Sequence, residues 1–295
     1  MQVPIAYFAV LIIWSTTPLA IVWSSETIPP TLAVLFRMVL ALVLGFFVLR
    51  FKRISLPWDP VSFRLYRYSA IGVFGGMTCA YLSAAYLPSG ILSLVFGLAP
   101  ILSSLLGYKI LNEDRLTRLK ISAMTICLVG LAIVCIDSVV LAGNTINYYT
   151  IFGLLLALTA VFMFSLSGVL VKSVQIEIHP LATTMGTLCV STPLFFIAWL
   201  ILDGGFQVSD WSYRSLASTF YLGVFGSLIG FYAYYLVLQK LTASTVALIT
   251  LITPVIAITL GSILNDEPLT FSLIFGALII VFGLALYNQK MLLKR

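Results

Sequence analysis

Apolar runs about twenty residues long follow one another along almost the whole chain, and they limit its fold more than any other feature. A run of roughly 20 apolar residues is the length at which an α-helix crosses a hydrocarbon core of about 30 Å. We count ten runs, at 4–23, 31–50, 67–86, 89–110, 118–137, 149–171, 180–202, 213–237, 242–263 and 269–288. The sequence therefore predicts an all-α integral membrane protein with ten transmembrane helices.

Composition excludes a water-soluble domain of ordinary type. Hydrophobic residues make up 61% of the chain and charged residues 9%, whereas a soluble domain carries about 25% charge.

The first apolar run lacks a basic flank and a cleavage site, so we expect no signal peptide. The four cysteines, Cys79, Cys127, Cys135 and Cys189, lie inside apolar runs without CxxC spacing. They indicate buried packing, and we expect no metal and no cofactor.

The basic residues predict an orientation. With the N-terminus in the cytoplasm and the connections assigned alternately, fourteen of the sixteen Lys and Arg residues fall on the inner side. Arg214 falls outside, and Arg37 lies within a helix. This asymmetry follows the positive-inside rule and predicts a multi-pass protein of the cell inner (plasma) membrane with both termini cytoplasmic. The net charge of +6 then reflects topology and attraction to anionic lipid, and we expect no nucleic-acid partner.

One stretch of the chain, 81–114, is repeated 153–154 residues later, at 235–267. At a shift of 154 the matched positions are Tyr81 with Tyr235, Leu94 with Leu248, Pro100 with Pro254, Gly107 with Gly261, and Glu113 with Glu267. Arg115, Arg118 and Lys120 follow the first copy directly, whereas the matching stretch of the second copy, 265–273, contains no basic residue. An odd number of helices per half would place the two copies on opposite membrane faces, which explains this difference.

The repeat therefore predicts two inverted five-helix halves, at 1–140 and 147–290. A weaker match supports the division, because Trp14-Ser15 corresponds to Phe164-Ser165 at an offset of 150. Before Tyr81 the register stays open, since the two Gly-Val-Phe-Gly strings match at 151 and a glycine pair at 154. Repeated halves of this kind are typical of transporters, in which two similar units move around one central site.

Several short motifs resemble a known family. The first helix ends in Ile-Ile-Trp-Ser-Thr-Thr-Pro at 12–18, the second contains Phe-Arg-Met at 36–38, and each repeat carries a mid-helix proline, a glycine and an Asn/Asp-Glu pair. Together with the inverted halves, these features resemble the EamA domain of the drug/metabolite transporter superfamily, over about 4–288. The copies differ at the Pro-Ser-Gly turn at 86–90, which 240–244 lacks. The resemblance implies a ten-helix carrier of small metabolites, amino acids among them, often moved outward.

Arg37 is the only full charge well inside a predicted span, roughly 10 Å below the outer boundary at 1.5 Å rise per residue. A buried arginine needs a partner or a watery cavity. One interpretation is that its planar fork binds a substrate carboxylate or another anionic group. The other is that it extends to the outer headgroups, or pairs with loop carbonyls or Glu26.

Aromatic side chains are the other candidates for a substrate-binding site, because they offer apolar area, cation–π surface and hydroxyl groups. The candidates are Trp14, Tyr81, Phe96, Tyr232 and Tyr235. Tyr221, Phe225, Tyr232 and Tyr235 stand at spacings of 4, 7 and 3, which predicts one shared helix face. The alternative is that these aromatics only pack, or belong to the aromatic belts at the membrane interfaces.

Two pairs of residues, one of prolines and one of glutamates, occupy matched positions in the two repeats. Pro100 and Pro254 lie about halfway along helices four and nine, where a proline frees a carbonyl and produces either a hinge or a static kink. Glu113 and Glu267 lie at helix ends, where we expect each to cap the following helix rather than to carry a proton. His179 precedes Pro180 and is interpreted as a boundary residue.

Residues and motifs that the sequence lacks argue against several classes of function. No Asp or Glu lies near the predicted midplane and no GxxxxGK[ST] string occurs, so we expect neither ATP drive nor an enzyme, and facilitated diffusion or exchange is favoured. The prediction is a monomeric secondary transporter whose partners are the lipid bilayer and a small-molecule substrate, most simply an exporter of amino acids or metabolites. The alternatives are an uptake permease for a vitamin, purine or quaternary amine, a carrier of a lipid-linked precursor, an intramembrane enzyme, and a receptor or assembly subunit.

Overall fold

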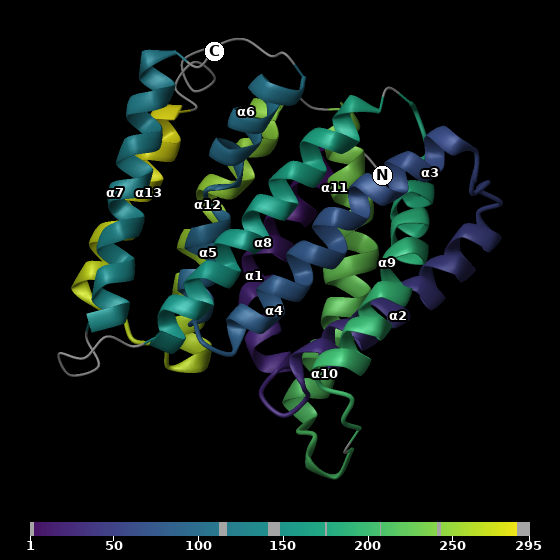
Figure 1. Cartoon of the computed structure of the whole chain (residues 1–295), viewed down its shortest axis with the longest axis horizontal. Helices are drawn as coiled ribbons and strands as arrows, with labels where there is room; N and C mark the ends of the chain where they lie inside the picture. Colours follow the sequence, from purple (N-terminus) through teal and green to yellow (C-terminus); the bar gives the residue numbers. More distant parts are fainter. Residues whose placement is uncertain are drawn as a thin grey trace.

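The protein is described by a computed structural model, in which residues 3–111, 117–140, 148–174, 176–206, 208–240 and 243–287 can be placed (Figure 1). Within these ranges the chain is helical and contains no β-strand. By length and composition six helical spans in these ranges are able to cross a membrane: Val3–Ser24, Pro30–Phe51, Ser89–Ile110, Tyr148–Ser173, Pro180–Leu202 and Tyr213–Lys240. The all-helical, membrane-type fold expected from the apolar runs is therefore confirmed for the described ranges.

The helices lie side by side across the view of Figure 1. The elements up to residue 140 are α1 (Val3–Ser24), α2 (Pro30–Phe51), α3 (Pro60–Ala70), η1 (Ile71–Gly76), α4 (Met77–Ala84), α5 (Ser89–Phe96), α6 (Ala99–Ile110) and α7 (Arg118–Val140). Those after it are α8 (Tyr148–Ser173), α9 (Pro180–Leu202), η2 (Val208–Asp210), α10 (Tyr213–Tyr221), η3 (Leu222–Ile229), α11 (Gly230–Lys240), α12 (Ala243–Asn265) and α13 (Phe271–Tyr287).

Local signals set several helix starts. Proline occupies the first turn of α2, α3 and α9, where its missing N–H costs no helical hydrogen bond. The carboxylate of Asp59 accepts from the backbone N–H of Val61 and Ser62 at the start of α3. The hydroxyl of Ser212 caps α10 in the same way. These caps satisfy N–H groups that the first turn of a helix leaves unpaired.

Two π-helical segments, η1 and η3, lie inside longer continuous helices. Each contains one of the two Gly-Val-Phe-Gly strings, which lie 151 residues apart, whereas Tyr81 and Tyr235, just beyond them, lie 154 apart. The offset between the two halves therefore changes across the π-helical stretch. A π turn accommodates inserted residues without ending the helix, and η3 has 8 residues against the 6 of η1.

α5 and α12 cross where glycines allow close approach. A Cβ atom added at Gly90 would lie 3.0 Å from Ile258, and one at Gly97 would lie 3.4 Å from Pro254. The chain from 89 to 110 is not one regular helix, because a turn at Gly97 separates α5 from α6 and places Pro100 in the first turn of α6. The physical reason is that proline has no N–H for the carbonyl four residues earlier. Pro254, in contrast, lies within the continuous helix α12.

The remaining packing joins early helices to late ones. α7 packs mainly on α13, and the two lie together at the left edge of Figure 1. α2 packs on α9. α1 packs on α10, α11 and α12, whereas α8 packs on η1, α4 and α6. The cavity described next lies between the helices up to residue 140 and those after it.

Candidate functional site

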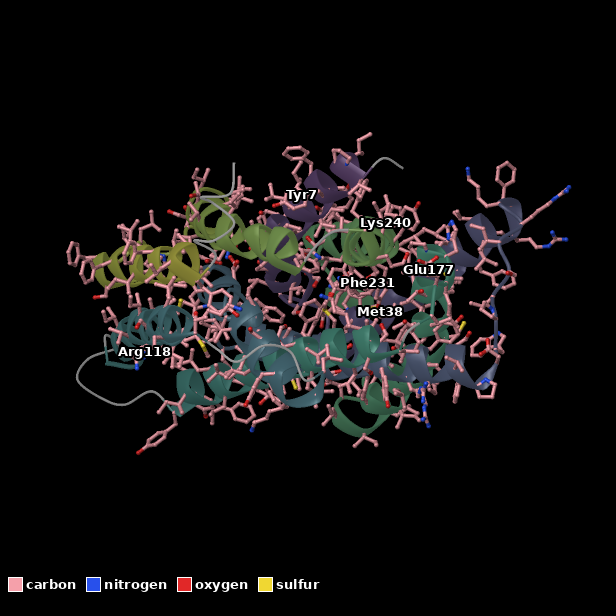
Figure 2. The ribbon with its side chains drawn as sticks, turned by 90° about the horizontal axis from the view of Figure 1, so that it is seen from above. Tyr7, Met38, Arg118, Glu177, Phe231 and Lys240 are labelled. Carbon is pink, nitrogen blue, oxygen red and sulfur yellow. The ribbon has the colours of Figure 1, made fainter. Side chains whose placement is uncertain are left out.

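A cavity of about 90 Å³ lies among α1, α2, α4, α5, α6, α8, η3, α11 and α12. Its lining is mostly apolar and aromatic, with a few polar groups. The lining residues are Trp14, Thr17, Pro18, Ile21, Arg37, Met77, Ala80, Leu92, Ser93, Phe96, Ala99, Phe164, Gly226, Phe231 and Thr253. Figure 2 shows Phe231, together with Met38, near the middle of the molecule, whereas Arg118 at the start of α7 lies toward one edge.

An aromatic cluster forms one wall of this cavity. The ring of Trp14 meets that of Phe164 edge-on, with centroids 5.7 Å apart, and the Phe164 and Phe96 centroids lie 6.3 Å apart. Tyr234 completes the cluster behind them, 5.2 Å from Trp14 and 5.7 Å from Phe164. Edge-to-face and tilted contacts of this kind hold rings in fixed positions. The wall therefore offers a shaped apolar surface to a bound molecule.

Arg37 brings a full charge to the same cavity. Its side chain is 1% exposed, and its Nε donates to the Ser227 hydroxyl at 2.7 Å. Gly226 leaves room for the guanidinium, since an added Cβ there would lie 3.1 Å from Nη2. Both residues belong to η3, so the π-helix positions the arginine. Among the described residues Nη1 has no hydrogen-bond partner.

No carboxylate neutralises this arginine within the described part of the chain. Glu26, the partner considered from the sequence, forms an ion pair with Arg214 at 2.7 Å instead. The described residues lining the cavity include no Asp or Glu. A buried, unpaired cation is costly, because burial removes the water that solvates the charge. Extension of Arg37 to the headgroups also disagrees with its burial.

The other predicted site residues lie elsewhere. Tyr81 is fully buried but does not line the cavity, and its hydroxyl has no partner among the described residues. The hydroxyls of Tyr235 and Ser69 are hydrogen-bonded beside a smaller pocket of about 10 Å³. Tyr232 lines a third hollow of about 340 Å³ together with Lys52 and His179.

Tyr232 and Tyr235 both belong to α11 and line different pockets, and η3 interrupts the α-helical spacing from which a shared face with Tyr221 and Phe225 was predicted. Phe164, in turn, was not among the predicted site residues. Its match to Trp14 at an offset of 150 was a signal that could have identified it.

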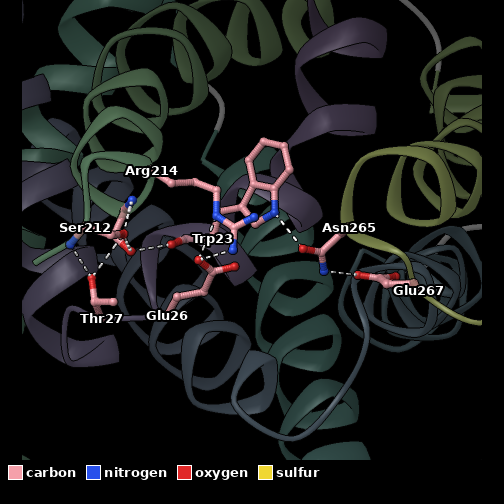
Figure 3. Close-up of polar contacts among 8 residues, drawn as sticks. Trp23, Glu26, Thr27, Ser212, Arg214, Asn265 and Glu267 are labelled. Atoms are coloured by element: carbon pink, nitrogen blue, oxygen red, sulfur yellow. Dashed lines mark hydrogen bonds and ion pairs between the residues drawn. The ribbon is translucent and has the colours of Figure 1, made fainter.

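A network of polar contacts ties together several helix ends at the lower end of the view in Figure 1 (Figure 3). The Arg214 guanidinium pairs with Glu26 and lies 5.6 Å from the ring of Trp23. The Trp23 indole N–H donates to the Asn265 side-chain oxygen at 2.8 Å, and Asn265 donates to Glu267 at 3.2 Å. The network thus links the ends of α1 and α12 to the start of α10.

Glu267 extends this network to α5. Its carboxylate accepts from the backbone N–H of Ser89 at 3.0 Å and of Gly90 at 3.2 Å. The expectation that Glu267 caps the helix that follows it is therefore wrong, because it caps a helix 178 residues earlier in the chain. An anion at a helix N-terminus is favoured by the backbone dipoles. Its repeat partner Glu113 lies outside the described residues.

Replacing Glu267 with glutamine is expected to lower the stability of the folded protein by about 1 kcal/mol, since the amide keeps the shape but loses the charge at the α5 N-terminus. Thermal unfolding in detergent would then shift downward by about 2 °C. Asp266→Asn is the matched control, because Asp266 is exposed with a φ of 50° that asparagine tolerates. Equal melting temperatures for the two variants would contradict a stabilising cap.

Comparison with known proteins gives consistent matches. The model of the EamA-like transporter family matches residues 3–136 and 151–289. An uncharacterized transporter of Archaeoglobus fulgidus is 25% identical, covering 94% of this chain and 95% of that protein. A probable amino-acid metabolite efflux pump of Escherichia coli is 25% identical, covering 93% and 91%. A probable terminal-alkyne amino-acid exporter of Streptantibioticus cattleyicolor is 29% identical, covering 71% and 67%.

A solved crystal structure shares the fold, with a TM-score of 0.67 at 19% identity over 99% of both chains. The family matches span nearly the whole chain and agree with the apolar helices found in the described ranges. This chain is a multi-pass membrane protein and belongs to the EamA-like transporter family.

Proposed function

We propose that this protein exports a small organic metabolite, of amino-acid size, across the plasma membrane by alternating access. The observation that carries the proposal is the cavity between early and late helices, which combines an aromatic wall with Arg37, buried without a carboxylate partner among the described residues. Pockets of this composition, apolar with a few placed polar groups, are typical of small-molecule sites. The names of the relatives from Escherichia coli and Streptantibioticus cattleyicolor support an outward direction and an amino-acid-like cargo.

The proposed mechanism requires two similar halves, and the packing supports them. We take helices up to residue 140 as one half and those from 147 to 290 as the other, ten membrane spans in all. Under an exchange of halves the contact of α1 with α11 corresponds to that of α8 with α4, and α1–α12 corresponds to α8–α6. The pairs α2–α9, α5–α12 and α7–α13 each correspond to themselves. Two separate family matches, one per half, point the same way.

We further propose that both termini are cytoplasmic, as the basic residues predict, so that the network of Trp23, Glu26, Arg214, Asn265 and Glu267 lies at the outer end. This network joins helix ends of both halves. Its contacts would have to separate for the cavity to open outward. The protein in this conformation would then be closed toward the outside.

The test is a competitive efflux experiment with purified protein reconstituted in liposomes. The liposomes are loaded with an equimolar mixture of amino acids, organic acids, amines and nucleobases, and the remaining contents are measured by mass spectrometry. We expect one chemical class to leave at least tenfold faster than from protein-free liposomes of the same lipid. If every compound left at the protein-free rate, the carrier function would be wrong.

A further inference from the structure

The charge of the cavity points to a narrower class of substrate, and this inference rests on the proposed export function. Arg37 contributes one positive charge, and the described lining residues contribute no negative one. We infer that the transported species is an organic monoanion, with one carboxylate and an apolar body, and that the membrane potential drives its export. A ligand of charge −1 makes the occupied cavity neutral, whereas a zwitterion leaves it with a net charge of +1.

The Arg37 guanidinium is held in an orientation that can bind a carboxylate. Nε donates a hydrogen bond to the Ser227 hydroxyl, and Nη2 lies close to Gly226. These contacts fix the plane of the guanidinium. Nη1 has no partner among the described residues, although it is buried. An unpaired donor of a charged group is expensive in an apolar environment, and a carboxylate is the partner that satisfies it best. Binding would therefore convert an unfavourable charge into a charge-assisted hydrogen bond.

An ammonium group has no corresponding partner among the described lining residues. The polar side chains there, besides Arg37, are Thr17, Ser93, Thr253 and the indole of Trp14. The hydroxyl of Thr17 already donates to the Ile13 carbonyl at 2.6 Å. Hydroxyls and aromatic faces attract a cation weakly compared with a carboxylate. The nearby positive charge of Arg37 would also repel an ammonium in the same small cavity.

The remaining surface suits the apolar body. Trp14, Phe96, Phe164 and Phe231 contribute ring faces and edges to the wall, and Ile21 and Leu92 contribute aliphatic groups. Such surfaces favour a phenyl or branched alkyl group over a second charge. The ligand would then lie with its carboxylate at η3 and its body against α1, α5 and α8.

The charge of the substrate determines what can drive it. A carrier that releases a monoanion and returns empty moves one negative charge outward in each cycle. Because the inside of a cell is electrically negative, this movement is favoured without a coupling proton or sodium ion. For one elementary charge and 100 mV, the outside-to-inside ratio at equilibrium is about 50. This result fits the absence of Asp and Glu from the described cavity lining.

The experiment compares ligands that share one body and differ in charge. The phenyl set is 3-phenylpropanoate, phenylalanine, 3-phenylpropanamide and 2-phenylethylamine, and the aliphatic pair is 4-methylpentanoate and leucine. Each compound is added to proteoliposomes adsorbed on an electrode, and the transient current is recorded. Leak of a protonated acid through lipid carries no current, so the signal reports the anion moved by the protein. Protein-free liposomes and Arg37→Gln proteoliposomes serve as controls.

We expect at least one carboxylate to give a current with the sign of negative charge entering the liposome, and the matched amino acid to give less than one tenth of it. An outside-positive or outside-negative diffusion potential, set with valinomycin and potassium, should change uptake of that carboxylate in opposite directions. Arg37→Gln should lose the current, and Arg37→Lys should retain part of it because the charge remains.

Other outcomes overturn the inference. If phenylalanine or leucine is taken up without current, measured with labelled compound, and the carboxylates are not, the substrate is a zwitterion and the proposed export function stands. A carboxylate current that persists in Arg37→Gln would remove Arg37 from the site. If no member of either set is moved or gives a current, the monoanion inference is wrong, and the mixed efflux experiment decides separately whether the protein is a carrier.

Discussion

Replacing Arg37 with methionine is expected to stabilise the empty protein and to weaken substrate binding strongly. The guanidinium is buried without a carboxylate among the described residues, and a methionine of similar length removes the cost of burying that charge. We expect a gain of about 1–3 kcal/mol, measured as a higher melting temperature in detergent. Loss of charge-assisted hydrogen bonds worth roughly 3 kcal/mol should weaken ligand binding about 100-fold.

The measurement is thermal unfolding with and without 3-phenylpropanoate and 4-methylpentanoate. A ligand present at 100 times its dissociation constant stabilises the folded protein by about 2.7 kcal/mol, so the wild type should show an upward shift that Arg37→Met lacks. Arg67→Met is the control, because Arg67 is exposed on α3, where its guanidinium lies over the ring of Phe63. A lower melting temperature for empty Arg37→Met would assign Arg37 a structural role and argue against a binding one.

A disulfide between α5 and α12 is expected to stop transport. A Cβ atom at Gly90 would lie 3.6 Å from the Cβ of Ile258, within the range of about 3.5–4.5 Å that disulfides require. These residues belong to different halves under the proposed mechanism. If the halves must separate during each cycle, the oxidised Gly90→Cys/Ile258→Cys double variant should transport at less than one tenth of its reduced rate.

Each single variant and the wild type, treated with the same oxidant, are the controls. The wild type matters because the four native cysteines must be shown not to respond. Formation of the bond is verified by mass spectrometry, and a reducing agent should restore transport in the same liposomes. Undiminished transport by the fully oxidised double variant would mean that the crossing of α5 and α12 stays fixed, and alternating access at this place would be wrong.

Sequence reasoning located part of the cavity lining. Trp14, Arg37 and Phe96, considered as site residues because of their chemistry and position, all line the cavity. A charged residue within an apolar run is informative on its own, since burial in a membrane requires a partner or a cavity. The role of each residue in binding stays a prediction that the Arg37 variants and the ligand series test.

The sequence was less informative where the backbone leaves regular α-helix geometry. A face shared by Tyr232 and Tyr235 with Tyr221 and Phe225 was inferred from α-helical spacing, which η3 interrupts between the two pairs. Glycine strings occur in many tightly packed helices, so Gly-Val-Phe-Gly does not by itself predict a π-helix. The cap formed by Glu267 was also unpredictable in its target, because a contact across 178 residues depends on the tertiary packing of α5 and α12.

The packing of α7 against α13 has a consequence for the order in which the protein is made. A Cβ atom at Gly130 would lie 2.8 Å from the Gly276 carbonyl, and one at Gly283 would lie 2.6 Å from the Cys127 sulfur, so the two backbones are in close contact. α7 is synthesised more than 130 residues before α13 begins. During translation the small-residue face of α7 therefore lies in the membrane without its partner, and a chain that ends after α12 but before residue 271 leaves α7 without α13.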